Sequence, residues 1–144
     1  MCIPPFLFLY KGEEEKMLQA YSRNLTFTDQ AAIPLNSAII QKGCTAVLAA
    51  PATIELNKAG VYMVSCDVAA TAGSGTVQMY KNGVAQPFAK AIIDADSGSF
   101  TSLVQVPNNN CKCNCLTSPT TLQFIADSTA AITGDINVVV TKIC

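Results

Sequence analysis

Three cysteines occupy alternate positions of one short polar stretch, NNNCKCNCLTSP, at Cys111, Cys113 and Cys115. A fourth cysteine, Cys144, is the last residue of the sequence. Thiols grouped in this way can hold a soft metal ion as thiolates, form disulfides, or pack as small apolar side chains. The residues themselves leave these three alternatives open.

The absence of histidine limits the chemistry that these thiols and the rest of the chain can perform. It excludes Ser-His-Asp and Cys-His activation of a nucleophile and every metal site that contains histidine. The C-x-C-x-C spacing also differs from the C-x2–4-C spacing of structural zinc sites. No base accompanies the thiols and no carboxylates pair as an acid and a base, so we predict that the protein is not an enzyme.

Asp94 and Asp96, in the stretch DADSGS, have the spacing of the first two ligands of a calcium loop. Gly98 stands at the next ligand position, and Gln105 stands where a bidentate glutamate is needed. A polar turn between strands is therefore the favoured interpretation, with calcium binding at Asp94 and Asp96 as the alternative.

Composition is consistent with one domain whose surface is partly hidden. The chain has 144 residues, of which 50% are hydrophobic and only 13% are charged, and its net charge is -1. This length suits a single core. The near-neutral charge lacks the basic surface that nucleic acid or an anionic membrane attracts, so we expect neither partner. The composition favours a tightly packed domain or an obligate oligomer.

Residues 1–16, MCIPPFLFLYKGEEEK, differ in character from the rest. Their apolar run is shorter than the about 20 residues that cross a bilayer, so membrane insertion is not expected. No basic residue precedes the run, which argues against a signal peptide. The codons of KGEEEK can form a bacterial ribosome-binding sequence just before Met17. We therefore interpret 1–16 as a non-native or disordered extension and 17–144 as the domain.

Short apolar, β-branched runs alternate with turn residues from Met17 onward, a pattern typical of an all-β sandwich or barrel. Within it, Asn82-Gly83 predicts a type I′ hairpin, because both residues tolerate positive φ. Pro87 lacks an amide proton and predicts an edge strand or a bulge. The expected strands are residues 17–24, 32–35, 38–41, 45–49, 53–56, 61–70, 76–81, 84–94, 99–106, 121–126 and 135–143.

Two of these strands are apolar on both faces. One face of 61–70 carries Tyr62, Val64, Cys66 and Val68, and in 135–143 one face carries Ile136, Val138 and Val140. The opposite faces carry Val61 and Met63 in the first strand and Val139 and Ile143 in the second. Burial on both sides is expected of such strands, by a second sheet and by a neighbouring subunit. Core pairs are expected at Ile54/Leu56, Val77/Met79, Phe100/Val104 and Leu122/Phe124.

The order of three segments, ATIELNKAGVYMVSCDVAA, GTVQMYKNGVA and DINVVVTKIC, resembles the globular-head family of complement first component q. That family shares the jelly roll of tumour necrosis factor, and the likeness is to its bacterial and phage-encoded versions. It extends over residues 17–144 and rests on Ile54 and Leu56 before a polar turn, Gly60-x-Tyr62, Asn82-Gly83 and the closing apolar strand at 138–143.

The resemblance implies an all-β, ten-strand, two-sheet jelly-roll sandwich that forms a homotrimer through apolar strand faces. Val61, Met63, Val139 and Ile143 would then lie at subunit contacts. In this jelly roll the strand that begins at Gly60 lies between the closing strand and strand 99–106, antiparallel to both. The loop after Val106 should therefore lie near Cys144. This arrangement favours a disulfide from Cys144 to one of the three loop cysteines, with a thiolate metal site or free thiols as alternatives.

The function expected from the resemblance is that of a structural and interaction module without enzymatic activity. It would be the trimeric head of a phage particle or of a bacterial surface assembly such as a spore coat, and would lie on a virion or a cell surface. The alternative is a carbohydrate- or receptor-binding head that acts through its end loops. No resident cofactor is expected beyond the metal alternatives already given.

Overall fold

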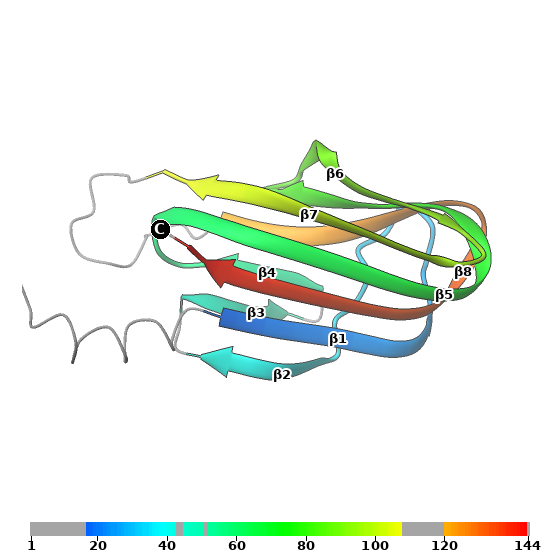
Figure 1. Cartoon of the computed structure of the whole chain (residues 1–144), viewed down its shortest axis with the longest axis horizontal. Helices are drawn as coiled ribbons and strands as arrows, with labels where there is room; N and C mark the ends of the chain where they lie inside the picture. The colour runs from blue at the N-terminus through cyan, green and yellow to red at the C-terminus, as the bar shows by residue number, and fades with distance from the viewer. Residues whose placement is uncertain (1–16, 43–44, 51, 108–119, 144) are drawn as a thin grey trace, which may run out of the picture.

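The computed structural model describes residues 17–42, 45–50, 52–107 and 120–143, and its strands form two facing layers (Figure 1). The described residues contain no helix, and therefore none that could cross a membrane. The strands are β1 (Met17–Thr26), β2 (Ser37–Lys42), β3 (Ala46–Ala50), β4 (Thr53–Leu56), β5 (Gly60–Lys81), β6 (Val84–Asp94), β7 (Ser97–Val106) and β8 (Thr120–Lys142).

The long strands β5 and β8 belong to both layers. They pair antiparallel from Tyr62 opposite Lys142 to Lys81 opposite Leu122. One half of this pair is flanked by β7 and by β1 with β2, giving the order β2-β1-β8-β5-β7, which we call the β1 layer. The other half gives β3-β4-β8-β5-β6, which we call the β6 layer.

This arrangement is the expected jelly roll. When β5 and β8 are counted once in each layer, the described residues supply ten strand segments. Two expected boundaries were wrong, however, because 61–70 and 76–81 form one continuous strand, and so do 121–126 and 135–143. The stretch TAGSG does not end a strand. It bends β5 from one layer into the other, where the ladder to β8 shifts register between Ala70 and Gly75.

The bend requires two backbones to pass closely. A Cβ on Gly134 of β8 would lie 2.2 Å from the carbonyl oxygen of Ala69 on β5. Gly73, on the other strand, has a φ of +96°, and its Cβ would lie 2.1 Å from the carbonyl oxygen of Ala131. Only glycine fits at such positions, because any side chain would collide with backbone that cannot move aside.

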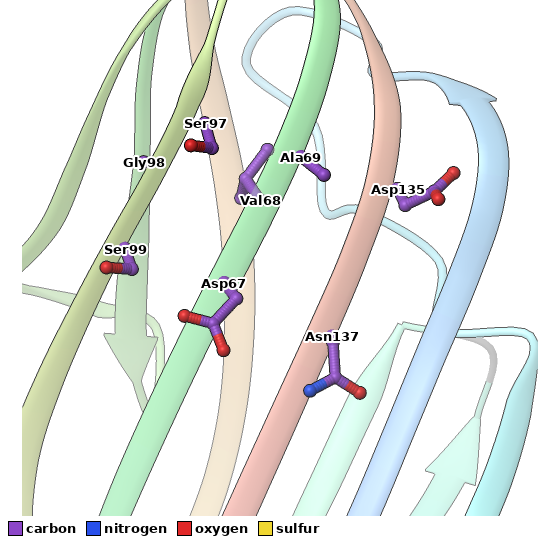
Figure 2. Close-up of a pocket in the computed structure, with 8 residues that line it drawn as sticks. All are labelled: Asp67, Val68, Ala69, Ser97, Gly98, Ser99, Asp135 and Asn137. Atoms are coloured by element: carbon purple, nitrogen blue, oxygen red, sulfur yellow. The ribbon is translucent and has the colours of Figure 1, made fainter.

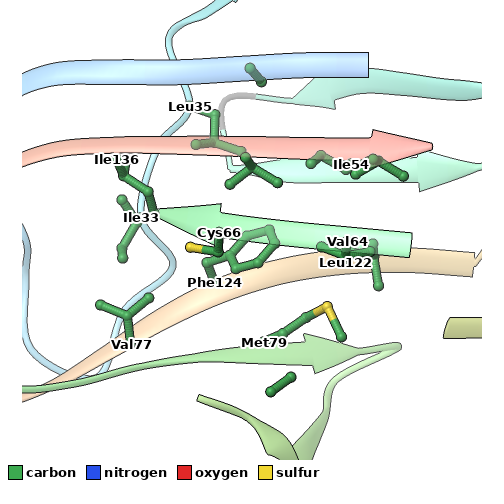
Figure 3. Packing of buried hydrophobic residues seen from close by; sticks show 14 of the residues in the cluster. Ile33, Leu35, Ile54, Val64, Cys66, Val77, Met79, Leu122, Phe124 and Ile136 are labelled. Atoms are coloured by element: carbon green, nitrogen blue, oxygen red, sulfur yellow. The ribbon is translucent and has the colours of Figure 1, made fainter. Parts of the chain in front are cut away.

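The core fills the space between the layers, and the expected inward pairs are confirmed (Figure 3). Phe100 of the β1 layer and Phe124 of the β6 layer bring their ring centroids within 6.3 Å of each other. The buried Tyr62 donates its hydroxyl to the Lys58 carbonyl at 2.6 Å, and burial raises the pKa of Tyr62 to about 12. Cys66 is completely buried, as the sequence predicts for a small apolar side chain.

The expected strand at 32–35 was wrong. The stretch makes only an isolated bridge, from Ala32 to Ile125 of β8, and no strand forms there. Pro34 cannot donate a ladder bond, and its carbonyl instead accepts a hydrogen bond from the Ser22 hydroxyl at 2.6 Å. The apolar side chains of this connection still enter the core, where Ile33 and Leu35 are each 1% exposed.

The hairpin and the edge position of Pro87 are confirmed. Asn82 and Gly83 have φ values of 52° and 82° and join Lys81 to Val84 across the turn. Strand β6 pairs only with β5, and the ladder is irregular beside Pro87. Because Pro87 lies on an edge strand, its missing amide proton costs the sheet no hydrogen bond.

Replacing Gly134 with alanine should destabilise the fold by about 1–3 kcal/mol, because the new methyl group would overlap the Ala69 carbonyl. Gly83→Asn is the matched control, since nothing lies within 4 Å of a Cβ there and asparagine tolerates positive φ. Its cost should stay below about 1 kcal/mol. Urea unfolding at one fixed protein concentration measures the free energy of unfolding of both variants. Equal losses of stability in the two variants would contradict the close approach of the β5 and β8 backbones at Gly134.

Candidate functional site on the outer face of the β1 layer

Cross-strand pairing fixes which side chains share the outer face of the β1 layer. One row across the strands consists of Met17, Thr141, Met63 and Leu103. Moving along the strands toward the bend, the next row has Gln19, Val139, Ser65 and Thr101, and the one after it has Tyr21, Asn137, Asp67 and Ser99. The face therefore changes along its length from apolar to polar.

The apolar end of this face consists of Val61, Met63, Leu103, Val139 and Ile143, and three of these residues are exposed to solvent in the single chain. Leu103 is 63% exposed, Ile143 is 50% exposed and Met63 is 40% exposed. The four residues expected at a subunit contact all belong to it, so the structure brings them together on one face. Exposed apolar side chains grouped on one face are typical of interaction surfaces.

The polar end of the face, which consists of Asp67, Ser97, Ser99, Asp135 and Asn137, lines a shallow depression of about 270 Å³ (Figure 2). A second depression of about 370 Å³ lies on the other side of β8 and shares Asp135 and Asn137 with the first. We call this second one the β2 groove. The residues that complete its lining are Tyr21, Ser22, Arg23, Ile39 and Ile136.

Hydrogen bonds orient the two residues that the depressions share. The Gln19 side-chain amide donates to Asn137 Oδ1 at 3.0 Å, and the backbone amide of Asn24 donates to Asp135 Oδ1 at 2.8 Å. Asp67 and Asp135 lie on neighbouring strands one diagonal step apart, at about 7–8 Å between Cα atoms. This end can therefore offer carboxylate, amide and hydroxyl groups to a ligand, but no nucleophile is paired with a base among them.

The thiol beneath this face is inert. Cys66 points into the core from β5, and burial, with a smaller contribution from the neighbouring Asp67 carboxylate, raises the pKa of its thiol far above the usual range. It remains a neutral thiol that packs among apolar side chains. It is also a free cysteine.

Cys111, Cys113, Cys115 and Cys144 lie outside the described residues. Strands β7 and β8 do flank the start of β5, because Gly60 pairs with Val106 and Tyr62 pairs with Lys142. The expectation that their carboxyl ends lie at one end of the sandwich is thus confirmed, and the proximity of the thiols stays a prediction.

Asp94 and Asp96 lie at the tight connection between β6 and β7. The Asp96 carboxylate accepts a hydrogen bond from the Ser97 amide at 2.7 Å, and Ala95 has a φ of 57°. Such a contact is typical of an aspartate that stabilises its own turn. Over the described ranges, no three His, Cys, Asp or Glu side chains are grouped so that they could hold a metal ion.

The sequence reasoning missed four large apolar residues that are exposed, Ile39, Phe88, Ile92 and Leu103. Alternation could have identified Leu103, since its neighbour Val104 was expected to point inward. The same signal could have identified Phe88 and Ile92, which flank the inward Ala89 and Ala91 on β6. Ile39 gave no such signal, because a bulge in the β1–β2 ladder decides its orientation.

Comparison with solved structures identifies the fold as that of complement C1q globular domains and tumour-necrosis-factor ligands. The globular domain of zebrafish complement 1qA protein matches with a TM-score of 0.68 and 6% identity, covering 90% of this chain and 98% of that one. Eiger TNF from S. frugiperda matches with a TM-score of 0.60 and 8% identity, over 90% and 94% of the two chains.

A third structure, murine APRIL at pH 5.0, matches with a TM-score of 0.56 and 11% identity, over 88% of this chain and 99% of that one. No protein-family model matches the sequence, and no curated protein matches it. The likeness is therefore one of fold.

Proposed function

We propose that this chain is a non-enzymatic structural and interaction module that assembles as a homotrimer through the outer face of the β1 layer. The observation that carries the proposal is the apolar end, where Met63, Leu103 and Ile143 are 40–63% exposed on one continuous sheet face. A monomer would leave this surface in water. The jelly-roll fold and the low charge of the chain, 13% of its residues, support the same proposal.

The energetics favour association. Burying a fully exposed side chain of this size is worth about 1.5–3 kcal/mol, so each of the three half-exposed side chains contributes about 1 kcal/mol per copy. The half-buried Val61 and Val139 extend the same surface. Closed rotational symmetry allows every copy to bury its face equally, which removes the surface from solvent without forming a fibre.

The setting we propose is the surface of a phage particle or of a bacterial assembly such as a spore coat. The sequence resemblance to bacterial and phage-encoded jelly-roll heads supports it. A trimer of a chain with only 13% charged residues, whose described residues pair no nucleophile with a base, suits a coat or head component. Genes for tail, capsid or coat proteins beside this gene would support the setting.

Substituting Met63 with lysine should convert the trimer to a monomer, because the contact would bury an unpaired charge. Light scattering coupled to size exclusion should give three times the 15.2 kDa chain mass for the wild type. Val47→Lys is the matched control, since Val47 lies on the outer face of the β6 layer opposite Glu55. A wild-type protein that is monomeric at all concentrations, or equal effects of both changes, would contradict the proposal.

A carbohydrate- or receptor-binding head is the second candidate, and the polar end of the face favours it. Asp67, Asn137 and the Ser97 and Ser99 hydroxyls present donors and acceptors in one depression, as recognition of a polyhydroxylated ligand requires. The site proposed for this candidate is on the sheet, whereas the sequence-based alternative was a site in the end loops. Binding on a glycan array that is lost in Asp67→Asn would support it; binding unchanged in that variant would exclude this depression.

A further inference from the structure

Asn82-Gly83, in the turn between β5 and β6, is the only Asn-Gly pair in the sequence. Asparagine is thermolabile, because the backbone nitrogen of the next residue can attack its side-chain carbonyl carbon. Glycine leaves that nitrogen unshielded, since it has no side chain. Both turn residues are exposed, and a Cβ placed on Gly83 would find nothing within 4 Å. The turn therefore has both the sequence and the open space that this reaction requires.

The side chain of Asn82 is held by Thr121, near the start of β8. Its Oδ1 accepts a hydrogen bond from the Thr121 backbone amide at 2.9 Å and a longer one from the Thr121 hydroxyl at 3.4 Å. The Asn82 backbone amide donates to the Thr121 carbonyl at 2.9 Å. Asn82 thus exchanges backbone bonds with Thr121 as a strand residue does, but with a side-chain oxygen as its acceptor. We call these three contacts the Thr121 clamp.

The clamp extends the ladder between β5 and β8 by one residue. The last pair of that ladder is Lys81 opposite Leu122, and the contacts of Asn82 with Thr121 continue it. A position at the end of a ladder opens at a lower free energy than one in its middle, because few other contacts must break with it. The turn can therefore move away from β8 without unfolding of the domain.

The clamp acts on the reaction in two opposite ways. Two donors to Oδ1 polarise the carbonyl group, as an oxyanion hole does, which favours attack on its carbon. The same donors hold the carbonyl toward β8, whereas ring closure needs its carbon beside the Gly83 nitrogen. The five-membered ring also fixes ψ of Asn82 at a value outside that of its type I′ turn, where its φ is 52°. Geometry decides the balance, because attack requires the two atoms to meet.

We propose that Asn82 is a self-modification site, at which the side-chain amide is lost as ammonia, and that the Thr121 clamp controls the rate. When the clamp opens, the Gly83 nitrogen forms a bond to Asn82 Cγ and the Cγ–Nδ2 bond breaks. The Gly83 amide proton leaves with the ammonia. Water then opens the resulting succinimide at either of its two ring C–N bonds, so water is the only co-reactant. This modification goes beyond the proposed homotrimer and does not depend on it.

The two products differ in their effect on the fold. Opening the ring at Cγ gives aspartate, whose carboxylate can still accept the Thr121 amide in a charge-assisted bond. Opening it at the main-chain carbonyl gives isoaspartate, which adds a methylene group to the main chain of a two-residue turn. The longer turn no longer fits the register that places Lys81 opposite Val84. Either product remains as a covalent record that this end of the ladder has opened.

Incubation of the full chain at mildly alkaline pH, folded or in urea, tests the control by the clamp. The tryptic peptide 82–90 reports the mass change from amide to acid, and fragmentation distinguishes aspartate from isoaspartate. The amide should be lost about tenfold more slowly, or slower still, in the folded chain, because the clamp must open first. Equal rates in the two states would overturn the control, and an amide that persists in urea would overturn the site.

Two variants of Thr121 isolate the clamp. Thr121→Pro removes both donors to Asn82 Oδ1 and should speed the loss of the amide in the folded chain about fivefold or more. Thr121→Val is the matched control, because it keeps the backbone donor at 2.9 Å, and its rate should stay within about twofold of the wild type. A folded Thr121→Pro chain with an unchanged rate would overturn the role of the clamp. Circular dichroism establishes folding, and if Thr121→Pro does not fold, the wild-type comparison with urea decides.

Discussion

The antiparallel pairing of β5 with β8 is the interaction on which the rest of the structure depends. The two strands have 22 and 23 residues, and they remain paired while both pass from one layer to the other (Figure 1). Each layer is built outward from this shared pair. Shifting the register by one residue would exchange Cys66 and Asp67 between core and surface, so the pairing decides both what is buried and what is offered to partners.

The same register divides the outer face of the β1 layer into an apolar end and a polar end. Met63 and Leu103 share one row, while Asp67, Ser99 and Asn137 share another nearer the bend. The apolar rows suit a contact between copies, whereas the polar rows remain suited to a ligand. Strand β6 lies at the edge of the other layer, where Pro87 and the bulge leave Phe88 exposed. A proline and a bulge are two of the features by which edge strands avoid pairing with another chain.

Residues whose environment depends on alternation could be predicted from the sequence. Tyr62, Val64 and Cys66 were expected on the inner face, and Asn82-Gly83 was expected to turn, because these features depend on local geometry. Longer-range features could not be predicted in this way. Gly73 and Gly75 look like a loop in the sequence, and only their passage against β8 shows that they bend a continuous strand. The orientation of Ile39 likewise depends on a bulge against β1.

The central claim is that a second copy covers the apolar end, and the oxidation rate of Met63 tests it most directly. Hydrogen peroxide converts an accessible methionine to its sulfoxide, and fragmentation mass spectrometry resolves each position. Met79, which is 1% exposed, is an internal reference, whereas Met63 is 40% exposed in the single chain. At concentrations of the assembled protein, Met63 should oxidise nearly as slowly as Met79. Oxidation of Met63 at the rate of a methionine in a short peptide would contradict the claim.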